Sequence, residues 1–553
     1  MANGDVPEKP HPDNGELTPP LTLTREDAIL ATALFLAMLV TGSFAMVPYV
    51  SGALLDDSVY VVTAMALAEG QGYRQLHLPG EPYQTKYPVL YPAALALLYQ
   101  IAPSFPDYLP LMKGFTLGCG ALGLALAYLY LVRFGYATRP QAIAATLLCV
   151  SSFRFNAMAA TTMSEMPFLL GLVGALWSLD KEIRSSAASR WPALLCGAML
   201  AMPAACRAVG VVVLFTGLAG LWRYGRSLRW PVLGAALLLL IGTSWHSAYF
   251  GQWRTGGAGS GGDVDYFGWI REVGWHAFGK VIAQNGGETI WLLTIQGADG
   301  ITAVKSSLPS AAWALIPVLF GVAALALLVF RLHRFRPLEW ILLAYLLVVL
   351  VWPWPPSRFL LPVLPLWLIY PVELVSRGIR AVTRQPFVSG AVGAAALSLI
   401  LLLNGRLFFD SVEQVRQSGW PNSPNDPSEL AAKWSSFTEV FTWLKANTQP
   451  DDLVASFHPS MTYLYTGRQS FSPLRIRPAA LYGAEVTAEQ VDQEMVQSLE
   501  KYRPRFILVN AFLPELQHSV ERLRADHPDM FRSVYQAGDT RFAIYEVHFP
   551  DSR

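Results

Sequence analysis

Six charged side chains stand apart from the others in this chain because they flank long apolar runs. They are two neighbouring aspartates, one glutamate, one lysine and two arginines: Asp56, Asp57, Glu165, Lys86, Arg207 and Arg358. A carboxylate can accept a proton from a reacting hydroxyl, whereas Arg and Lys supply the fixed cations that bind phosphate. A charge at the edge of hydrocarbon is costly and is usually kept for a function. Together these residues predict a site for an anionic, lipid-borne substrate.

The composition is that of a membrane protein. Hydrophobic residues make up 53% of the 553 residues and charged residues only 15%, against the ~25% charged content of soluble domains. The net charge of +1 gives no argument for a nucleic-acid partner. The four cysteines lie in apolar stretches and show neither a disulfide framework nor a metal-ligand spacing.

Apolar runs long enough to cross a bilayer predict about eleven transmembrane helices, which makes the fold class an α-helical multi-pass membrane protein. We expect the spans at 28–48, 110–132, 140–158, 164–180, 191–205, 207–222, 230–250, 309–331, 337–353, 358–375 and 387–409. The segment 88–102 is shorter and is interrupted by prolines, so it is interpreted as a helix lying on the membrane surface.

This threading places the Arg-rich loops on one side, which the positive-inside rule assigns to the cytoplasm. The amino terminus is then cytoplasmic, with residues 1–26 as a disordered tail. Residues 27–409 form the transmembrane domain, whose external loops are 49–109 and 251–308. The carboxyl terminus and the six charged residues lie outside. The second external loop begins with glycines, which suit either a lid or a mobile linker.

From residue 410 the composition becomes that of a soluble domain. Its hydrophobic spacing predicts alternating helices and strands, hence a small external α/β domain over 410–553. We expect helices at 437–447, 459–465, 490–502 and 515–526, and strands at 453–457, 506–509, 531–536 and 542–547. This domain contains neither a nucleotide-binding glycine fingerprint nor a nucleophile elbow.

Four short motifs occur in order along the presumed external face. The acidic pair opens a short helix that ends at Gly70, and Thr85-Lys86-Tyr87-Pro88 follows. Further on come Thr162-Met163-Ser164-Glu165-Met166-Pro167, Cys206-Arg207-Ala208-Val209-Gly210 and Ser357-Arg358-Phe359-Leu360-Leu361-Pro362. In this order and on this side, they resemble the glycosyltransferase-C (GT-C) superfamily, above all its protein O-mannosyltransferases and lipid A aminoarabinose transferases. The tail resembles the external domain of bacterial members.

The resemblance implies a bacterial inner-membrane enzyme that transfers a sugar, with inversion, from a polyprenyl-phosphate carrier to an external acceptor. It implies that Asp56 is the general base and that Asp57 positions the acceptor or a metal ion, although relatives often have Asp-Glu here and either acid could be the base. The substrate-binding residues it implies are Tyr60, Lys86, Tyr87, Glu165, Arg207 and Arg358, with the three cations on the phosphate. A divalent metal stays open, as do the donor sugar and the acceptor.

Structural roles compete with these assignments. Asp56 or Asp57 could cap the following helix, and Glu165 could do the same for its own helix. Arg207 and Arg358 could be interfacial anchors. A different function, lipid-linked-sugar flippase or transporter, predicts charges at the bilayer midplane and repeated sets of spans. Neither feature is visible in the sequence. A membrane-held platform for a binding domain would leave the six charges unexplained.

Overall fold

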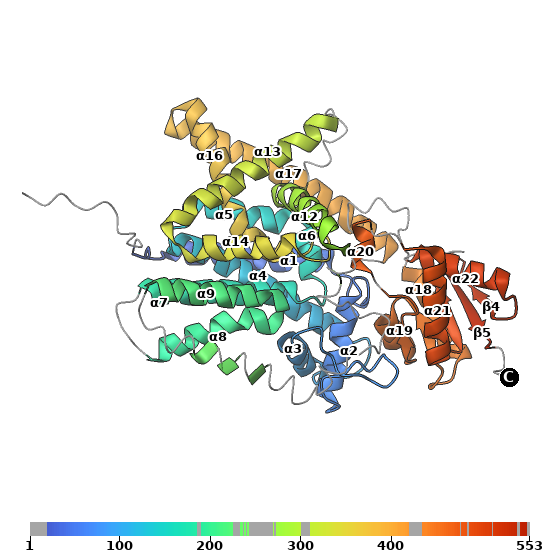
Figure 1. The fold of residues 1–553 in the computed structure, drawn as a ribbon. Coiled ribbons are helices and arrows are strands. Elements are labelled where there is room, and N and C mark those ends of the chain that lie inside the picture. The colour runs from blue at the N-terminus through green and yellow to red at the C-terminus, as the bar shows by residue number, and fades with distance from the viewer. Residues whose placement is uncertain are drawn as a thin grey trace, which may run out of the picture.

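The computed structural model describes residues 19–549, apart from 185–189, most of 225–272, 300–309, 420–433 and short gaps at 476, 484–485, 511–512 and 539–541. Within these residues the chain is mainly helical up to residue 418, and a small mixed domain follows it (Figure 1). The predicted span 230–250 and the glycine-rich start of the second external loop lie almost entirely outside the described residues.

The helices of the first part pack in chain order: α1 on α4, α4 on α7, α7 on α8 and α8 on α9. Their bounds are α1 Arg25–Ala45, α4 Tyr108–Arg133, α7 Glu165–Arg184, α8 Arg190–Cys206 and α9 Val211–Tyr224. The helices of the second half are α12 Trp275–Ile295, α13 Ser310–Arg331, α14 Pro337–Leu350, α16 Ile369–Thr383 and α17 Pro386–Ser418.

The number of long apolar helices is smaller than the eleven spans predicted. Four helices in the described part of the chain are long and apolar enough to cross a membrane: Arg25–Ala45, Tyr108–Arg133, Leu315–Arg334 and Pro386–Ser418. A fifth arises if α5 (Arg139–Ser151) and α6 (Phe153–Ala159), which meet at a bend of 71°, count as one span. The apolar outer surface of α17, whose most apolar window has no buried residues, suits contact with lipid.

The remaining predicted spans are shorter or interrupted helices. The run 358–375 is divided into η4 (Leu361–Val363), α15 (Leu364–Trp367) and α16, each of the first two containing a proline near its start. Proline removes a backbone donor, so a helix tends to restart at it. The run 275–295 was expected within an external loop, but it forms α12, which packs against α13 and α14. The segment 88–102 contains a helix, α3 (Leu90–Tyr99), as predicted; its place on the membrane surface stays a prediction.

The carboxyl-terminal domain contains a five-stranded sheet in the order β2-β1-β3-β5-β4. Strands β1, β2 and β3 are parallel, whereas β5 runs antiparallel to both β3 and β4. All predicted strands and helices of this domain are confirmed within a few residues. The strands are β1 Val454–Ser456, β2 Ser470–Phe471, β3 Phe506–Val509, β4 Phe531–Gln536 and β5 Ala543–Val547. The two-residue strand β2 and the short helix α20 (Pro478–Leu481) were not predicted.

Alternate residues of β3 face the two layers that cover the sheet, as the period of a strand requires. Phe506 and Leu508 pack with Phe437 of α18 (Trp434–Asn447), and Ile507 packs with Met495 of α21 (Ala488–Tyr502). Helix α22 (Pro514–Asp526) joins α21 on the second face, as Figure 1 shows at the right of the molecule.

Helix α19 (Pro459–Thr466) holds this domain against the first external loop. It contacts α2 (Asp56–Ala68), and Ser460 Oγ lies 2.7 Å from Ser58 Oγ. The Tyr465 hydroxyl donates to the carbonyl of Tyr49 at 2.6 Å and accepts from the backbone N–H of Ser51 at 3.0 Å. These polar contacts fix the position of the loop that carries the acidic pair.

Candidate active site

A strained turn presents the first acid of the pair. Leu55 has φ 62° and ψ −59°, and the backbone N–H of Asp56 donates to the carbonyl of Leu54 at 2.7 Å. This geometry is that of a γ-turn, a rare conformation for a non-glycine residue. Strain of this kind costs about 1–3 kcal/mol and is found mainly at functional sites. The turn starts α2 abruptly and makes Asp56 its first residue.

Asp56 is at the centre of a charged cluster formed by three distant parts of the chain. Arg358 Nη2 donates to Asp56 Oδ2 at 2.5 Å, Lys86 Nζ lies 3.9 Å from Oδ1, and the Tyr87 hydroxyl also donates to Oδ1. Burial raises the pKa of Asp56, but the Arg358 and Lys86 charges and the Tyr87 hydrogen bond outweigh it and hold the pKa well below its usual range. Asp56 is therefore ionised at neutral pH.

The neighbouring acid, Asp57, points into the loop. Its two carboxylate oxygens accept the backbone N–H groups of Gly52 at 2.7 Å and Leu54 at 3.0 Å. Lys113 of α4 lies behind it and donates to the carbonyls of Val47 and Val50. Consecutive residues at a helix start point in different directions, so the geometry separates the two acids. Asp57 ties down the loop before α2. It does not cap this helix, as the structural alternative expected, because the start of α2 has no side-chain cap hydrogen bond.

Glu165 lies behind the two arginines. Arg207 Nη1 is 2.7 Å from Glu165 Oε1, and Arg358 Nε is 3.8 Å from the same oxygen. Arg207 also donates to Ser164 Oγ at 2.9 Å, and that hydroxyl lies 2.8 Å from the hydroxyl of Tyr60. Glu165 is fully buried and lies close to both arginines. It is therefore placed to orient these two basic side chains.

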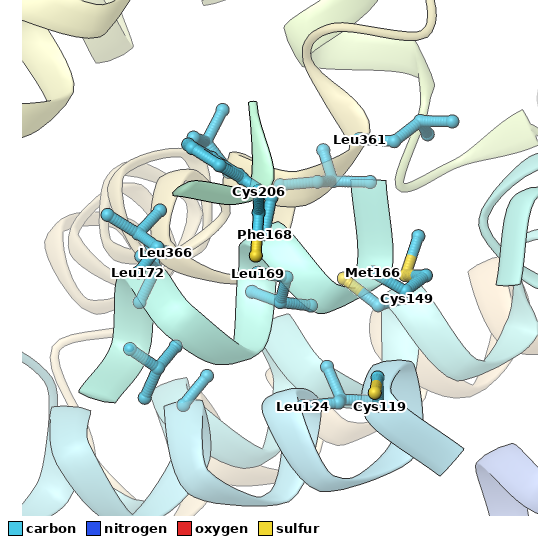
Figure 2. Close-up of a cluster of buried hydrophobic side chains, with 14 of the residues drawn as sticks. Cys119, Leu124, Cys149, Met166, Phe168, Leu169, Leu172, Cys206, Leu361 and Leu366 are labelled. Carbon is cyan, nitrogen blue, oxygen red and sulfur yellow. The ribbon is translucent and has the colours of Figure 1, made fainter. Parts of the chain in front are cut away.

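A close backbone crossing and an apolar cluster position the two arginine segments. Gly210 lies so close to α8 that a Cβ added to it would be 2.2 Å from the Pro203 carbonyl carbon, which forces a tight turn at Arg207. Figure 2 shows Cys206 and Leu361 lying in one cluster with Phe168 of α7. These two residues stand one before Arg207 and three after Arg358, so a shared hydrophobic core fixes both cations in place.

These residues open into a cavity of about 720 Å³. Six of the eight predicted site residues line it: Asp56, Tyr60, Lys86, Tyr87, Arg207 and Arg358. The other two, Asp57 and Glu165, do not. The lining also includes the apolar residues Val209, Val212 and Val348, together with Phe457, Pro459, Ser460 and Ser472 of the carboxyl-terminal domain. Nothing local in the sequence marks these last residues as close to the motifs.

No metal site is evident at this cluster. Among the residues that the structure describes, no group of three or more His, Cys, Asp or Glu side chains is placed to hold an ion. Asp56, the one carboxylate among the described residues that line the cavity, is already paired with cations. The described residues therefore do not fit a resident metal ion.

Comparison with family models and with curated sequences finds no match. Solved structures do match along nearly the whole chain. ArnT from Cupriavidus metallidurans bound to undecaprenyl phosphate is 11% identical with a TM-score of 0.50, covering 95% of this chain and 98% of that chain. Archaeal oligosaccharyltransferase AglB from Archaeoglobus fulgidus, in complex with an inhibitory peptide and a dolichol-phosphate, is 11% identical with a TM-score of 0.54, covering 96% and 76%.

The chain has the same fold as these structures, which are members of the GT-C superfamily. ArnT in the apo state matches similarly, with 12% identity and a TM-score of 0.51 over 94% of this chain and 97% of that chain. At such identities the likeness concerns the fold, so the function has to be argued from the cavity and its side chains.

Proposed function

We propose that this protein is a glycosyltransferase that moves a sugar from a polyprenyl-phosphate carrier to an acceptor at the extracytoplasmic face of a bacterial inner membrane. In this proposal residues 27–409 form the membrane catalytic domain, crossed about eleven times when the shorter helices are included. Residues 410–553 form the external domain. The fold shared with proteins solved in complex with undecaprenyl phosphate and dolichol-phosphate supports the proposal.

The observation that carries this proposal is the distribution of chemistry within one cavity. Three cations and one carboxylate meet in a cavity that is also lined by apolar residues of α9 and α14 and by polar residues of the first loop and the carboxyl-terminal domain. A polyprenyl-phosphate sugar has the same order of parts: hydrocarbon chain, phosphate, then sugar. Arg matches phosphate oxygens with its planar fork, and a partly desolvated site strengthens the attraction.

The reaction follows from that placement. The acceptor hydroxyl attacks the anomeric carbon from the face opposite the phosphate, so a new carbon–oxygen bond forms as the bond to the phosphate oxygen breaks. The hydroxyl proton passes to the Asp56 carboxylate. The bonding pair leaves with the lipid phosphate, whose charge is met by Lys86, Arg207 and Arg358. Backside attack inverts the anomeric centre.

The ion pair at Asp56 makes the basicity of this carboxylate depend on donor binding. While Arg358 and Lys86 hold Asp56, its carboxylate is a weak base because its pKa is low. A donor phosphate competes for both cations, and their displacement from Asp56 raises its pKa and its basicity. Donor binding therefore prepares the base.

The decisive experiment replaces Asp56 with Asn, which keeps the shape of the side chain and removes its charge. In detergent, with a labelled polyprenyl-phosphate sugar as donor, we expect transfer to fall by a factor of about 10²–10⁴, with donor binding retained. Asp107→Asn, at a surface turn where Asp107 accepts from Ser104, is the matched control. Wild-type turnover by Asp56→Asn would reject the role, and carrier movement between leaflets without transfer would favour a flippase.

A further inference from the structure

One wall of the cavity is not used by the chemistry above. It consists of five uncharged polar residues, which we call the polar wall: Gln75, His77, Gln84, Ser460 and Ser472. All five are buried, with between 1% and 7% of their surface exposed. A buried polar side chain in a native protein nearly always has a hydrogen-bond partner. Three of the five already have such a partner: Ser460 is bonded to Ser58, Ser472 to the carbonyl of Leu474, and Gln84 to the N–H of Lys86. The signal for a ligand with hydroxyl groups therefore comes from His77.

The polar wall is built from two parts of the chain that lie far apart in sequence. Backbone bonds from Gln75 N–H to the Pro82 carbonyl (2.9 Å) and from Gln84 N–H to the Tyr73 carbonyl (2.8 Å) close a compact loop. The Ser470 N–H of β2 then donates to the His77 carbonyl at 2.7 Å. The external domain is therefore hydrogen-bonded to the loop at the residue that faces the cavity.

His77 provides the most specific signal in the wall. Its Nδ1 is buried and has no hydrogen-bond partner among the residues that the structure describes. Burial lowers the pKa of His77 to about 3, so the ring is neutral at physiological pH. A neutral imidazole offers one donor and one acceptor, which is the pairing that a sugar hydroxyl, itself both donor and acceptor, can satisfy.

The polar wall lies next to one of the cations of the site, Lys86. The side-chain carbonyl of Gln84 accepts the backbone N–H of Lys86 at 2.9 Å, so these two residues are adjacent in space as well as in sequence. A group bonded directly to a phosphate at Lys86 and Arg358 lies next to this wall. In a polyprenyl-phosphate sugar, that group is the sugar.

We propose that the polar wall is the subsite for the donor sugar, that His77 hydrogen-bonds one of its hydroxyls, and that the sugar is uncharged. This inference rests on the proposed function. Among the described residues that line the cavity, the charged side chains are Asp56, Lys86, Arg207 and Arg358. In the proposed reaction the phosphate and the attacking hydroxyl occupy these four, so none is left to balance a uronic acid or an amino sugar. A charged sugar would therefore be desolvated there without a partner, which is strongly unfavourable.

The test measures binding to the purified full-length protein in detergent. The probes are undecaprenyl phosphate without a sugar, the same carrier with glucose, mannose or arabinose, and the carrier with glucuronic acid. We expect the wild type to bind at least one neutral-sugar carrier about tenfold or more tightly than the glucuronic acid carrier. His77→Phe should weaken binding of that carrier about tenfold, as expected for a lost hydrogen bond and an unpaired ligand group, and leave undecaprenyl phosphate unaffected.

Two further variants show whether a loss of binding is specific to the hydrogen-bonding groups of His77. His77→Asn restores a donor and an acceptor and should recover part of the affinity, whereas His518→Phe, at an exposed site on α22, should bind all probes as the wild type does. Unchanged sugar binding by His77→Phe, or equal affinity of the wild type for glucuronic acid, would overturn this inference while carrier binding still supported the proposed function. A wild type that binds no undecaprenyl phosphate would overturn both.

Discussion

At the scale of single residues, neighbours of the same type do different work. Asp56 faces Arg358 and Lys86 in the cavity, whereas Asp57 accepts hydrogen bonds from two backbone N–H groups of its own loop. The γ-turn at Leu55 is what separates them, since it fixes the direction in which α2 begins. Of the two adjacent acids, Asp56 lines the cavity and Asp57 does not.

The variant Asp57→Ala is expected to destabilise the protein rather than to remove its chemistry. Two backbone donors would lose their acceptor, at about 1–3 kcal/mol each when buried. Thermal unfolding should show a lower Tm and a smaller folded yield, while turnover per folded molecule stays within a few-fold of wild type. Loss of turnover in a variant with a wild-type Tm would instead assign Asp57 to the reaction.

The pH dependence of transfer should report the surroundings of Asp56. Its pKa is depressed in the free enzyme, so the base is ionised above its low pKa and kcat/KM is lost only as the pH falls through that value. Tyr87→Phe removes a hydrogen bond to the charged carboxylate, which raises the pKa. We expect the acid limb of the kcat/KM profile to move to higher pH in this variant. An unmoved limb would show that another group controls it.

At the scale of elements, the loop before α2 is shaped by close contact with α19. Gly52 has φ 113°, and a Cβ there would lie 2.6 Å from Met461 Cβ. The same Gly52 N–H is held by Asp57. A single residue thus joins the turn, the acidic pair and the external domain, and only glycine fits because both the backbone angle and the space exclude a side chain.

Gly52→Ala is expected to impair stability and transfer together. Backbone strain of about 1–2 kcal/mol adds to a steric clash that must displace α19, and this displaces Asp56 as well. Gly70→Ala is the matched control, since Gly70 also has a positive φ (74°) but has open space around it. A lower Tm in both variants with loss of transfer only in Gly52→Ala, measured side by side, is the expected result. Equal loss in both would remove the steric argument.

At the scale of the whole molecule, the helical part of the chain and the carboxyl-terminal domain share one cavity. Lys86 and Arg358 of the former and Ser460 and Ser472 of the latter line it. Such a cavity requires the first loop, both arginine segments and the external domain to lie on the same side of the membrane.

Cysteine labelling in intact cells tests this topology. The four native cysteines are buried, so they should not react with a membrane-impermeant maleimide. We expect Lys445→Cys, on an exposed position of α18, to be labelled from outside, and Arg334→Cys, exposed in the predicted cytoplasmic loop, to be labelled only after permeabilisation. External labelling at residue 334 would reverse the proposed orientation.

Local patterning was sufficient for much of the fold. The helix and strand order of the external domain follows from hydrophobic spacing, because packing on either face of β3 imposes that spacing directly. The number of membrane spans was harder to predict from the sequence. Apolar runs interrupted at Pro362 and Pro365, or bent between α5 and α6, have the composition of a span without its length.

The candidate site, too, was predictable from the sequence only in part. The sequence by itself determined the membrane character, the order of the motifs and four of the residues that line the cavity, because charge beside hydrocarbon is visible wherever it occurs. Two further lining residues, Tyr60 and Tyr87, followed only from the resemblance to the GT-C superfamily. Only the tertiary structure decided that Asp56 meets Arg358 across 302 residues, that Asp57 faces away from the cavity, and that His77 belongs to it. The direction in which a side chain points and the distance between two side chains depend on how the segments pack. Spacing along the chain gives neither.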